Sequence, residues 1–468
     1  MRCNLFFILL LLPAFFLSQK NSETVKIVDA KSNEEVLYSK ISNINSDQKI
    51  SDADVDNVIY KKVQGIYYKR IIPNNIVDVT WFGQNSDAIQ KAVDFVSVDL
   101  GPWKRAKYSV YLPEGTYVID KPIKITNVEG MHLYGGGIGT LLEIKQNTNV
   151  SSVLELNGTA YGVYENFYFG GASGSSCDSF INMYWGDKAS SEQKNGNPRR
   201  SSTQNSFTNI RNISGKFKNA VRIDGHNQND MSMWYNCSFN GDWNPTETKY
   251  YQSAFYMGDG SAGNNLIHNF QNSYIAGVKT AFIFAGVGGS IMGGGASNID
   301  TYIVRNNPNE TLLVSAVRLE GTKRIYRNDG YLNGIHEYPD NVTLQNIWYS
   351  ASGSPHPYFN SAEDGILIFH GGGTMNLMGS TFTNFPPGKI IRFKLSGAMN
   401  DHFHNAMNII GCNIPEKFNN LFIVDKWAHA SVNVMGSNET TAQGLQMGNH
   451  VHQWSKDFNF KSSTISGQ

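Results

Sequence analysis

The chain is poor in charge, and this shortage excludes whole classes of protein. Charged residues make up only 17% of its 468 residues, and 39 basic side chains balance 39 acidic ones. A protein that binds nucleic acid by neutralising phosphates needs a basic excess, so this balance argues against a nucleic-acid partner. Aromatic residues reach 12%, which argues against a disordered chain. The sequence also lacks CxxC and HxxxH spacings, so we expect no metal site of those types.

Long apolar runs are scarce as well, and the longest lies at the N-terminus. The run "LFFILLLLPAFFL" follows Arg2, is too short to span a membrane comfortably, and ends at Ser18. It predicts a signal peptide over residues 1–18, with an uncleaved anchor as the alternative. We therefore expect a secreted protein, extracellular or periplasmic, without a membrane span in its mature form. The cysteines beyond this segment are too few and odd in number for a disulfide framework, and we expect them buried and reduced: Cys177, Cys237 and Cys412.

What the sequence has in abundance is asparagine and glycine, with 51 Asn beside 45 Gly. Both residues tolerate left-handed backbone, so such a chain contains many tight turns. Residues 19–64 are polar and mixed, and we interpret them as a linker and small leading region. From Gly65 the pattern sharpens into strands broken by Gly and Pro. Between them, "NSDAIQKAVDFV" predicts a short helix with Ser86 as N-cap and apolar positions at Ala88, Ile89, Ala92, Val93 and Val96.

This order of elements resembles the opening of the pectate-lyase-superfamily β-helix, which also occurs in bacteriophage tailspikes and glycosyl-hydrolase-28-like proteins. In that family a Phe-Gly turn leads into a capping helix, and a Leu-Pro-x-Gly-x-Tyr strand begins the coil. The Gly- and Asp-rich loop usual after the turn is shortened here to "QNSD". The resemblance implies the fold and says nothing specific about the substrate. The matching residues are Trp81, Phe82, Gly83, Ala88, Ile89, Leu112, Pro113, Gly115, Thr116, Tyr117 and Val118.

An internal repeat supports the same fold independently. Segments such as "WYNCSFNG" and "TLQNIWYS" alternate with strands such as "AVRIDG" and "AFIFAG", at intervals of unequal length. A single rung cannot bury its apolar face, so rungs must stack. We predict an all-β, single-stranded, right-handed parallel β-helix over residues 65–440 with an N-terminal capping helix, then a C-terminal tail over 441–468. A β-propeller would need a more even period. Asn236, Asn272 and Asn346 occupy one position and predict an amide ladder between rungs.

Alignment of the second strands of the repeat places chemically complementary side chains in two outward columns. One column contains Arg222, Tyr256 and Arg318, and the other contains Asp224 and Glu320, with Asp259 one step later at a turn. We predict this surface as the active face. The predicted catalytic residues are Asp224, Asp259 and Glu320, and the predicted substrate-binding residues are Arg222, His226, Tyr256, Arg318 and Trp243.

Carboxylates, cations and aromatic rings on one face suit an acidic polysaccharide. A glycoside hydrolase needs two carboxylates, whereas a lyase needs a base and cations that neutralise a uronate carboxylate. We therefore predict a secreted polysaccharide-degrading enzyme, lyase or hydrolase, with no cofactor unless a lyase uses calcium. The alternative is a non-catalytic β-helix that binds glycan or serves as an adhesive or structural spike. Arg222 beside Asp224, and Arg318 beside Glu320, could equally form surface ion pairs, and Trp243 could simply pack its loop against the coil. The sequence leaves the oligomeric state open.

Overall fold

The computed structural model describes most of the chain. The described residues are 23–29, 33–44, 48–100, 103–184, 202–224, 231–258, 267–306, 310–328, 340–350, 366–370, 373–383, 393–396, 405–414, 422–424, 430–441, 444–455 and 458–464. The predicted signal peptide lies outside these ranges. No helix in the described part is long and apolar enough to cross a membrane.

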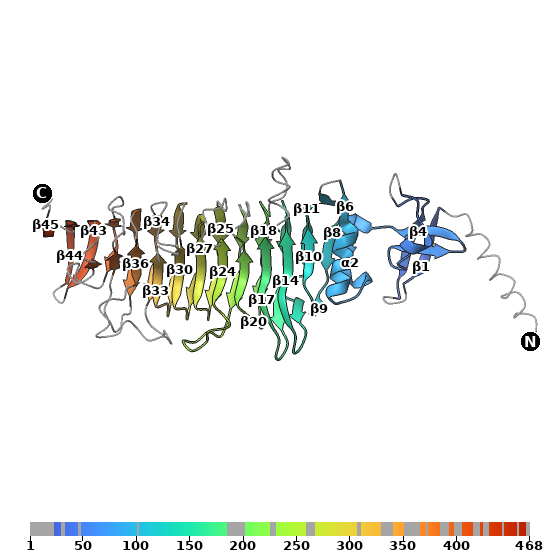
Figure 1. Cartoon of the computed structure of the whole chain (residues 1–468), viewed down its shortest axis with the longest axis horizontal. Helices are drawn as coiled ribbons and strands as arrows, with labels where there is room; N and C mark the ends of the chain where they lie inside the picture. Colours follow the sequence, from blue (N-terminus) through green and yellow to red (C-terminus); the bar gives the residue numbers. More distant parts are fainter. Residues whose placement is uncertain are drawn as a thin grey trace, which may run out of the picture.

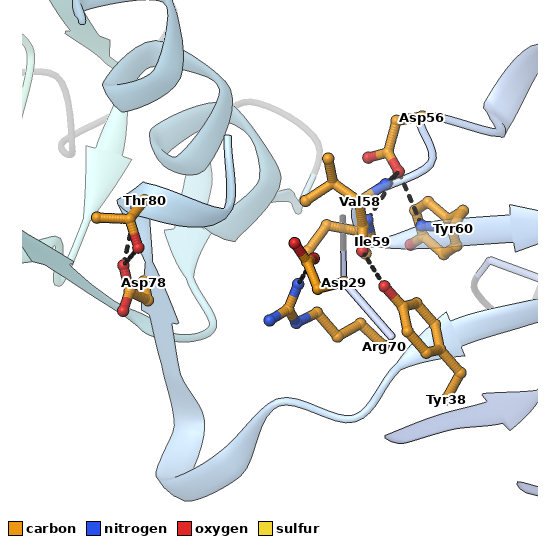
Figure 2. Close-up of polar contacts among 9 residues, drawn as sticks. All are labelled: Asp29, Tyr38, Asp56, Val58, Ile59, Tyr60, Arg70, Asp78 and Thr80. Atoms are coloured by element: carbon orange, nitrogen blue, oxygen red, sulfur yellow. Dashed lines mark hydrogen bonds and ion pairs between the residues drawn. The ribbon is translucent and has the colours of Figure 1, made fainter. Parts of the chain in front are cut away.

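A small antiparallel sheet precedes the coil (Figure 1). Its strands, in spatial order, are β1 (Thr24–Val28), β2 (Glu35–Lys40), β4 (Ile66–Arg70) and β3 (Tyr60–Val63). The Asp56 carboxylate closes a turn beside it by accepting backbone N–H bonds from Val58, Ile59 and Tyr60 at 2.7–2.8 Å (Figure 2). Strand β4 belongs to this sheet, although the coil was predicted to begin at residue 65. Its alternating residues pair with β2 and β3 instead of starting a rung.

Arg70 connects this leading sheet to the coil. Its Nη1 lies 3.5 Å from Asp29 Oδ2 across the sheet (Figure 2), and its guanidinium lies 3.7 Å from the centre of the Trp81 ring. Trp81 belongs to the short 3-10 helix η3 (Val79–Trp81), which leads from β5 (Ile76–Asp78) toward the capping helix. An ion pair and a cation–π contact therefore act on one buried guanidinium, and burial suits arginine because its guanidinium is weakly hydrated.

The capping helix α2 (Ser86–Val96) covers the N-terminal end of the coil (Figure 1). All five predicted apolar positions are buried, which confirms the helical pattern. The N-cap is Asn85 and not Ser86: the Asn85 side chain accepts from the Ala88 N–H at 2.9 Å, while Ser86 lies inside the helix and its hydroxyl donates to Asp120 Oδ1 at 2.5 Å. Asn in extended backbone is as good an N-cap as Ser, so the sequence pattern fitted both positions.

Each rung of the coil contains three short strands, where the repeat had suggested two. Strands of successive rungs pair in parallel and form three long sheets, which we call sheet 1, sheet 2 and sheet 3 in chain order. Sheet 1 contains β5, β8 (Ser109–Leu112), β12 (His132–Gly135), β15 (Val163–Glu165), β18 (Ser206–Thr208), β22 (Met233–Tyr235), β25 (Ile267–Gln271), β28 (Gly288–Met292), β31 (Leu312–Ser315), β34 (Asp340–Gln345), β37 (Gly373–Met378), β40 (Asn405–Ile410) and β43 (Ala430–Thr441).

The other two sheets follow the same order along the coil. Sheet 2 contains β9 (Gly115–Ile119), β13 (Thr140–Ile144), β16 (Tyr168–Gly171), β19 (Arg211–Asn212), β23 (Ser238–Asn240), β26 (Tyr274–Ala276), β29 (Gly295–Ser297), β32 (Arg318–Glu320), β35 (Trp348–Ser350), β38 (Thr381–Thr383) and β41 (Asn413–Ile414). Sheet 3 contains β10 (Ile123–Thr126), β14 (Asn149–Asn157), β17 (Ser176–Tyr184), β21 (Asn219–Ile223), β24 (Ser253–Gly258), β27 (Thr280–Ala285), β30 (Thr301–Asn306), β33 (Arg324–Asn328), β36 (Leu367–His370), β39 (Phe393–Ser396) and β42 (Phe422–Val424).

In the described chain, four further short strands lie outside the three long sheets: β6 (Ser97–Asp99), β7 (Lys104–Ala106), β11 (Val128–Glu129) and β20 (Lys216–Phe217). Three of them form a small sheet in the order β11, β7, β6, and β20 pairs with β17. At the C-terminal end, β44 (Gly444–Ser455) pairs antiparallel with β43, and β45 (Phe458–Thr464) pairs antiparallel with β44. The architecture is thus a right-handed parallel β-helix, as predicted, with a helix at its N-terminal end and antiparallel strands at its C-terminal end.

The bend between sheets 1 and 2 explains the abundance of asparagine. Asn209, Asn236, Asn272 and Asn346 all adopt left-handed backbone there, with φ of 52–53°. The Asn236 side-chain amide donates to Asn209 Oδ1 at 2.6 Å, and that of Asn209 donates to Asn166 Oδ1 at 2.9 Å. The predicted amide ladder is therefore confirmed at Asn236 and continues to the two preceding rungs, whereas Asn272 and Asn346 share the left-handed backbone without a described bond of this kind.

The interior of the coil is a stack of large apolar side chains. In sheet 1 the inward column runs Leu133, Tyr164, Phe207, Trp234, Phe270, Ile291 and Val314, all buried. Cys177, Cys237 and Cys412 are buried free thiols, as predicted, and burial raises the pKa of Cys237 to about 12. Cys237 and Cys412 lie at the same bend six rungs apart, roughly 29 Å at the strand spacing of a sheet, so they cannot form a disulfide.

His268 is buried within this stack. Its Nδ1 lies 2.6 Å from Ser232 Oγ, which also accepts from the Trp234 indole N–H at 2.8 Å. Complete burial disfavours the charged imidazolium and lowers the pKa of His268 to about 4. The hydrogen bond and the burial assign His268 to the core and not to a catalytic surface.

This burial predicts acid sensitivity with a defined pH window. The unfolded histidine has a pKa near 6.5, so between pH 6.5 and about 4 only the unfolded chain takes up the proton. Stability is therefore complete above pH 6.5 and falls, by about 3 kcal/mol in all, as the pH drops to about 4. Thermal unfolding measured between pH 8 and pH 4 should show this loss, and the His268→Gln variant should show less of it. Equal pH slopes in both proteins would contradict the assignment.

Candidate functional site

Two of the predicted site residues, Arg222 and Tyr256, lie side by side on sheet 3. Arg222 on β21 pairs in register with Tyr256 on β24, and its guanidinium stacks on the Tyr256 ring at 4.2 Å. Arg222 Nη1 also donates to the carbonyl oxygens of Gly258 at 2.6 Å and Ile223 at 3.1 Å. The cation predicted to hold substrate is thus largely occupied in closing the end of β24. Asp224 follows directly after β21, half-exposed, with its backbone N–H bonded to the Met183 carbonyl.

Gly258 shows why the Arg222 contact is fixed. Its φ of +85° is left-handed, and a side-chain carbon there would lie 1.8 Å from the Ala285 carbonyl oxygen of the next rung. Only glycine fits this position. Arg222 binds the carbonyl oxygen of this constrained glycine.

Arg318 and Glu320 lie on a different sheet from Arg222 and Asp224. Strand β32 pairs with β29 and β35 of sheet 2, whereas the next strands of sheet 3 are β27, β30 and β33. The single active face predicted from the alignment is therefore wrong. The column that begins with Arg222 and Tyr256 continues through Ile283, Val304 and Arg327.

The cause of this misalignment is one alanine. Ala316 has a φ of 56° and occupies the left-handed position that Asn or Gly takes on other rungs. Without that signal, "AVRLEG" resembles a sheet 3 strand that ends in glycine. The actual sheet 3 strands of these rungs, "TYIVRN" and "RIYRN", end without a glycine and were missed.

On sheet 2, Arg318 and Glu320 belong to a row that includes polar and aromatic side chains. Tyr274, Gly295, Arg318 and Trp348 are consecutive in register on β26, β29, β32 and β35. The Arg318 guanidinium stacks on the Trp348 ring at 4.6 Å, and its Nε donates to Glu320 Oε1 at 2.9 Å. The Tyr274 hydroxyl donates to Ser297 Oγ at 2.9 Å. We call Tyr274, Gly295, Arg318 and Trp348, together with Ser297 and Glu320, the sheet 2 row.

The sheet 2 row is exposed at Tyr274 and Arg318, partly exposed at Trp348 and buried at Gly295. The Arg318 and Glu320 side chains are 67% and 42% exposed, and Tyr274 is 44% exposed. Gly295, between Tyr274 and Arg318 in register, is buried, and a side-chain carbon there would lie 2.2 Å from the Arg318 carbonyl oxygen, so glycine lets the two strands approach closely. Tyr274 and Trp348 were not predicted as site residues. Their only sequence signal is an outward position in the strand, which is clear only once the register is known.

Trp243 lies in the connection between sheets 2 and 3. Its backbone N–H bonds to the Gly277 carbonyl beyond β26, and its indole N–H donates to the Glu247 carbonyl at 3.1 Å. Tyr251 of the same connection packs against Phe217 and the core. The segment is thus folded down beside the sheet 2 row, with Trp243 half-exposed at its edge. His226 and Asp259 lie outside the described residues.

In the part of the chain that the structure describes, no group of three or more His, Cys, Asp or Glu side chains has a geometry that could hold a metal ion.

Comparisons with known proteins place the chain by fold alone. No protein-family model matches it, and no curated protein sequence does. Solved structures do match: the gp42 tailspike of Acinetobacter phage vb_AbaP_AS12 has 11% identity and a TM-score of 0.52, over 86% of this chain and 68% of that one. The N-terminal fragment of bacteriophage Phi29 gene product 12 has 13% identity and a TM-score of 0.53, over 78% and 62%.

A third similar structure is the enzymatically active domain of tailspike protein 2 from bacteriophage CBA120. It shares 11% identity with a TM-score of 0.50, over 88% of this chain and 56% of that one. This chain thus covers between 56% and 68% of the length of these three structures. At such identities the likeness shows the parallel β-helix, which confirms the predicted fold, and it does not show the pectate-lyase superfamily as such.

Proposed function

We propose that this β-helix binds an acidic polysaccharide along the sheet 2 row and degrades it, as a lyase or a glycoside hydrolase of the pectate-lyase-superfamily type. The observation that carries the proposal is the register of Tyr274, Gly295, Arg318 and Trp348, in which Tyr274 and Arg318 are exposed and Trp348 is partly exposed, with Glu320 beside it. Three rung steps at the strand spacing give roughly 14 Å, a length that suits a few sugar units. We also propose that the protein is exported, on the N-terminal apolar run.

The chemistry of the row fits a sugar acid. The aromatic rings of Tyr274 and Trp348 offer apolar area to the faces of sugar rings. Arg318 presents a planar fork of donors that matches a carboxylate in two-point contact. A polymer carboxylate that binds the Arg318 guanidinium would displace the Glu320 carboxylate from it.

The pairing of one cation with one carboxylate supports a lyase over a hydrolase. In a lyase, Arg318 neutralises the uronate carboxylate and the freed Glu320 removes the proton beside it. A hydrolase needs a second carboxylate within about 10 Å of the first. Of the predicted partners, Asp224 lies on sheet 3 and Asp259 lies outside the described residues.

A second candidate function is binding without cleavage. It is favoured by the bond between Arg318 and Glu320, because both Nε and Nη2 of the arginine donate to that carboxylate. In that case the row is a surface for glycan attachment, and the ion pair serves only to orient Arg318 over Trp348.

Glu320→Gln should lower turnover by about a hundredfold or more while leaving thermal stability almost unchanged, since an exposed side chain contributes little to the core. Arg318→Ala should mainly weaken binding of an acidic polymer. The assay is incubation with uronate-containing and neutral polysaccharides: absorbance of unsaturated uronate indicates a lyase, and reducing ends without it indicate a hydrolase. Glu143→Gln, in the same outward column of sheet 2 on β13, is the matched control and should keep full activity.

The outcomes separate the two functions. Binding that depends on Arg318 without any product would support the attachment surface. Full activity of Glu320→Gln on a verified polymer would exclude the sheet 2 row as the catalytic centre.

A further inference from the structure

Sheet 1 brings together a serine, a histidine and a glutamate on three consecutive rungs near the N-terminal end of the coil. Ser109 on β8, His132 on β12 and Glu165 on β15 all point outward, because Val110, Leu133 and Tyr164 between them fill the core. Ser109 Oγ lies 3.1 Å from His132 Nδ1, and His132 Nε2 lies 3.0 Å from Glu165 Oε1. The imidazole thus bridges a hydroxyl and a carboxylate.

The partners of the two ring nitrogens define which one carries the proton. A carboxylate only accepts hydrogen bonds, so His132 Nε2 must donate to Glu165. A neutral imidazole then has an unprotonated Nδ1, which accepts from the Ser109 hydroxyl. This arrangement is the one required of a general base: the lone pair is directed at the serine proton, and the far side of the ring is held by an anion.

The imidazole is also fixed in orientation and reachable from solvent. Its ring stacks on Tyr134 at 4.7 Å between centroids, and Tyr134 stacks on Tyr111 at 4.9 Å. Burial, with Tyr111, Asp78 and Glu165 nearby, raises the pKa of Tyr134, so its hydroxyl stays a donor. The His132 and Glu165 side chains are 36% and 28% exposed, and Ser109 is partly exposed.

We propose that Ser109, His132 and Glu165 form a nucleophilic triad that hydrolyses esters of short-chain carboxylic acids. The inference goes beyond the proposed polysaccharide degradation and does not depend on it, because it uses other residues on another sheet. The ester could be a small free molecule or an acyl group on a sugar hydroxyl. Both have the same reacting carbonyl, and the experiment separates them.

The reaction balances with water as the only co-reactant. Ser109 Oγ bonds to the acyl carbon while its proton moves to His132 Nδ1. The ester C–O bond then breaks, and the leaving alcohol takes that proton. Water next attacks the acyl carbon and gives a proton to Nδ1, the Oγ–carbon bond breaks, and Ser109 recovers the proton as the carboxylic acid leaves. Glu165 stays ionised throughout and stabilises the imidazolium through Nε2–H.

The test uses the full chain with p-nitrophenyl acetate, and separately with an O-acetylated polysaccharide and its de-acetylated form. Ser109→Ala should lower hydrolysis by about a hundredfold or more. Ser206→Ala is the matched control, since Ser206 is outward in the same column of sheet 1, two rungs beyond His132, and should change nothing. Glu165 is a positioning residue, so Glu165→Gln should lower kcat with KM unchanged and Glu165→Asp should restore part of it.

A labelling experiment on the unmodified chain guards against folding effects of the variants. Phenylmethanesulfonyl fluoride should attach to Ser109, identified by peptide mass, and abolish hydrolysis. Release of acetate from the polymer identifies a sugar ester, whereas hydrolysis of p-nitrophenyl acetate alone identifies a small-ester hydrolase. Absence of both hydrolysis and labelling, or hydrolysis that survives Ser109→Ala, overturns the triad. Neither result bears on cleavage of the polysaccharide backbone at the sheet 2 row.

Discussion

Asp340→Asn is expected to destabilise the rungs around β30 to β34 by about 3–5 kcal/mol, because it leaves a charged guanidinium uncompensated in the interior. Asp340 begins β34 and Arg305 lies near the end of β30, and both side chains are fully buried. Arg305 Nη2 lies 3.4 Å from Asp340 Oδ1 and donates to the Glu310 carbonyl at 2.6 Å. Asn328 and the Tyr326 hydroxyl both donate to Asp340 Oδ2.

The size of this effect follows from the asymmetry of buried pairs. The pair itself contributes little net stability, since desolvation offsets attraction, but removal of one partner leaves the full desolvation penalty of the other. Arg305→Met should therefore be about as harmful as Asp340→Asn, and the double variant should be less harmful than either alone. A solenoid opens rung by rung, so hydrogen exchange of the β30, β33 and β34 amides is the appropriate measurement.

Arg318→Ala is the matched control, because its ion pair with Glu320 lies on the neighbouring β32 but is exposed. Water screens such a pair, and its loss should cost less than about 1 kcal/mol. If the amides of these rungs exchanged as slowly in Asp340→Asn as in the unchanged chain, a group other than Asp340 would have to neutralise Arg305.

The fold could be predicted from the sequence because the repeat reflects what each rung requires, namely an apolar interior and a tight bend. Alternating apolar residues fill the interior of the described rungs, and Asn or Gly marks the left-handed bend between sheets 1 and 2 on most of them, Ala316 being an exception. The capping helix was equally clear from the spacing of its buried residues. Each of these signals depends on neighbours in the chain, which the sequence displays directly.

The site depends instead on the register between rungs, which the sequence does not display. One rung with Ala316 at its bend was enough to assign Arg318 and Glu320 to the wrong sheet, because outward positions on all three sheets have the same alternation. The cluster of Ser109, His132 and Glu165 was invisible for the same reason. Its members are 23 and 33 residues apart in the chain and meet only through the pairing of β8, β12 and β15.

Trp234→Ala is expected to destabilise the middle of the coil by about 3–5 kcal/mol, the range for removal of a large aromatic side chain from a core. Trp234 on β22 is 1% exposed and stacks on Phe207 of the preceding rung with ring centroids 3.8 Å apart. Its edge meets Phe255 at 5.1 Å, and its indole N–H donates to Ser232 Oγ. An alanine leaves a cavity between rungs that backbone pairing prevents from closing.

Tyr235→Ala provides the control for Trp234, since the two residues are adjacent on one short strand and differ in direction. Tyr235 points outward and is 47% exposed, so its removal should cost less than about 0.5 kcal/mol. Thermal unfolding and hydrogen exchange of β18, β22 and β25 should separate the two variants clearly. Because each rung contacts only its neighbours, the loss in Trp234→Ala should be concentrated there and fade toward α2 and β43. Uniform loss along the whole coil would instead mean that the rungs unfold as a single cooperative unit.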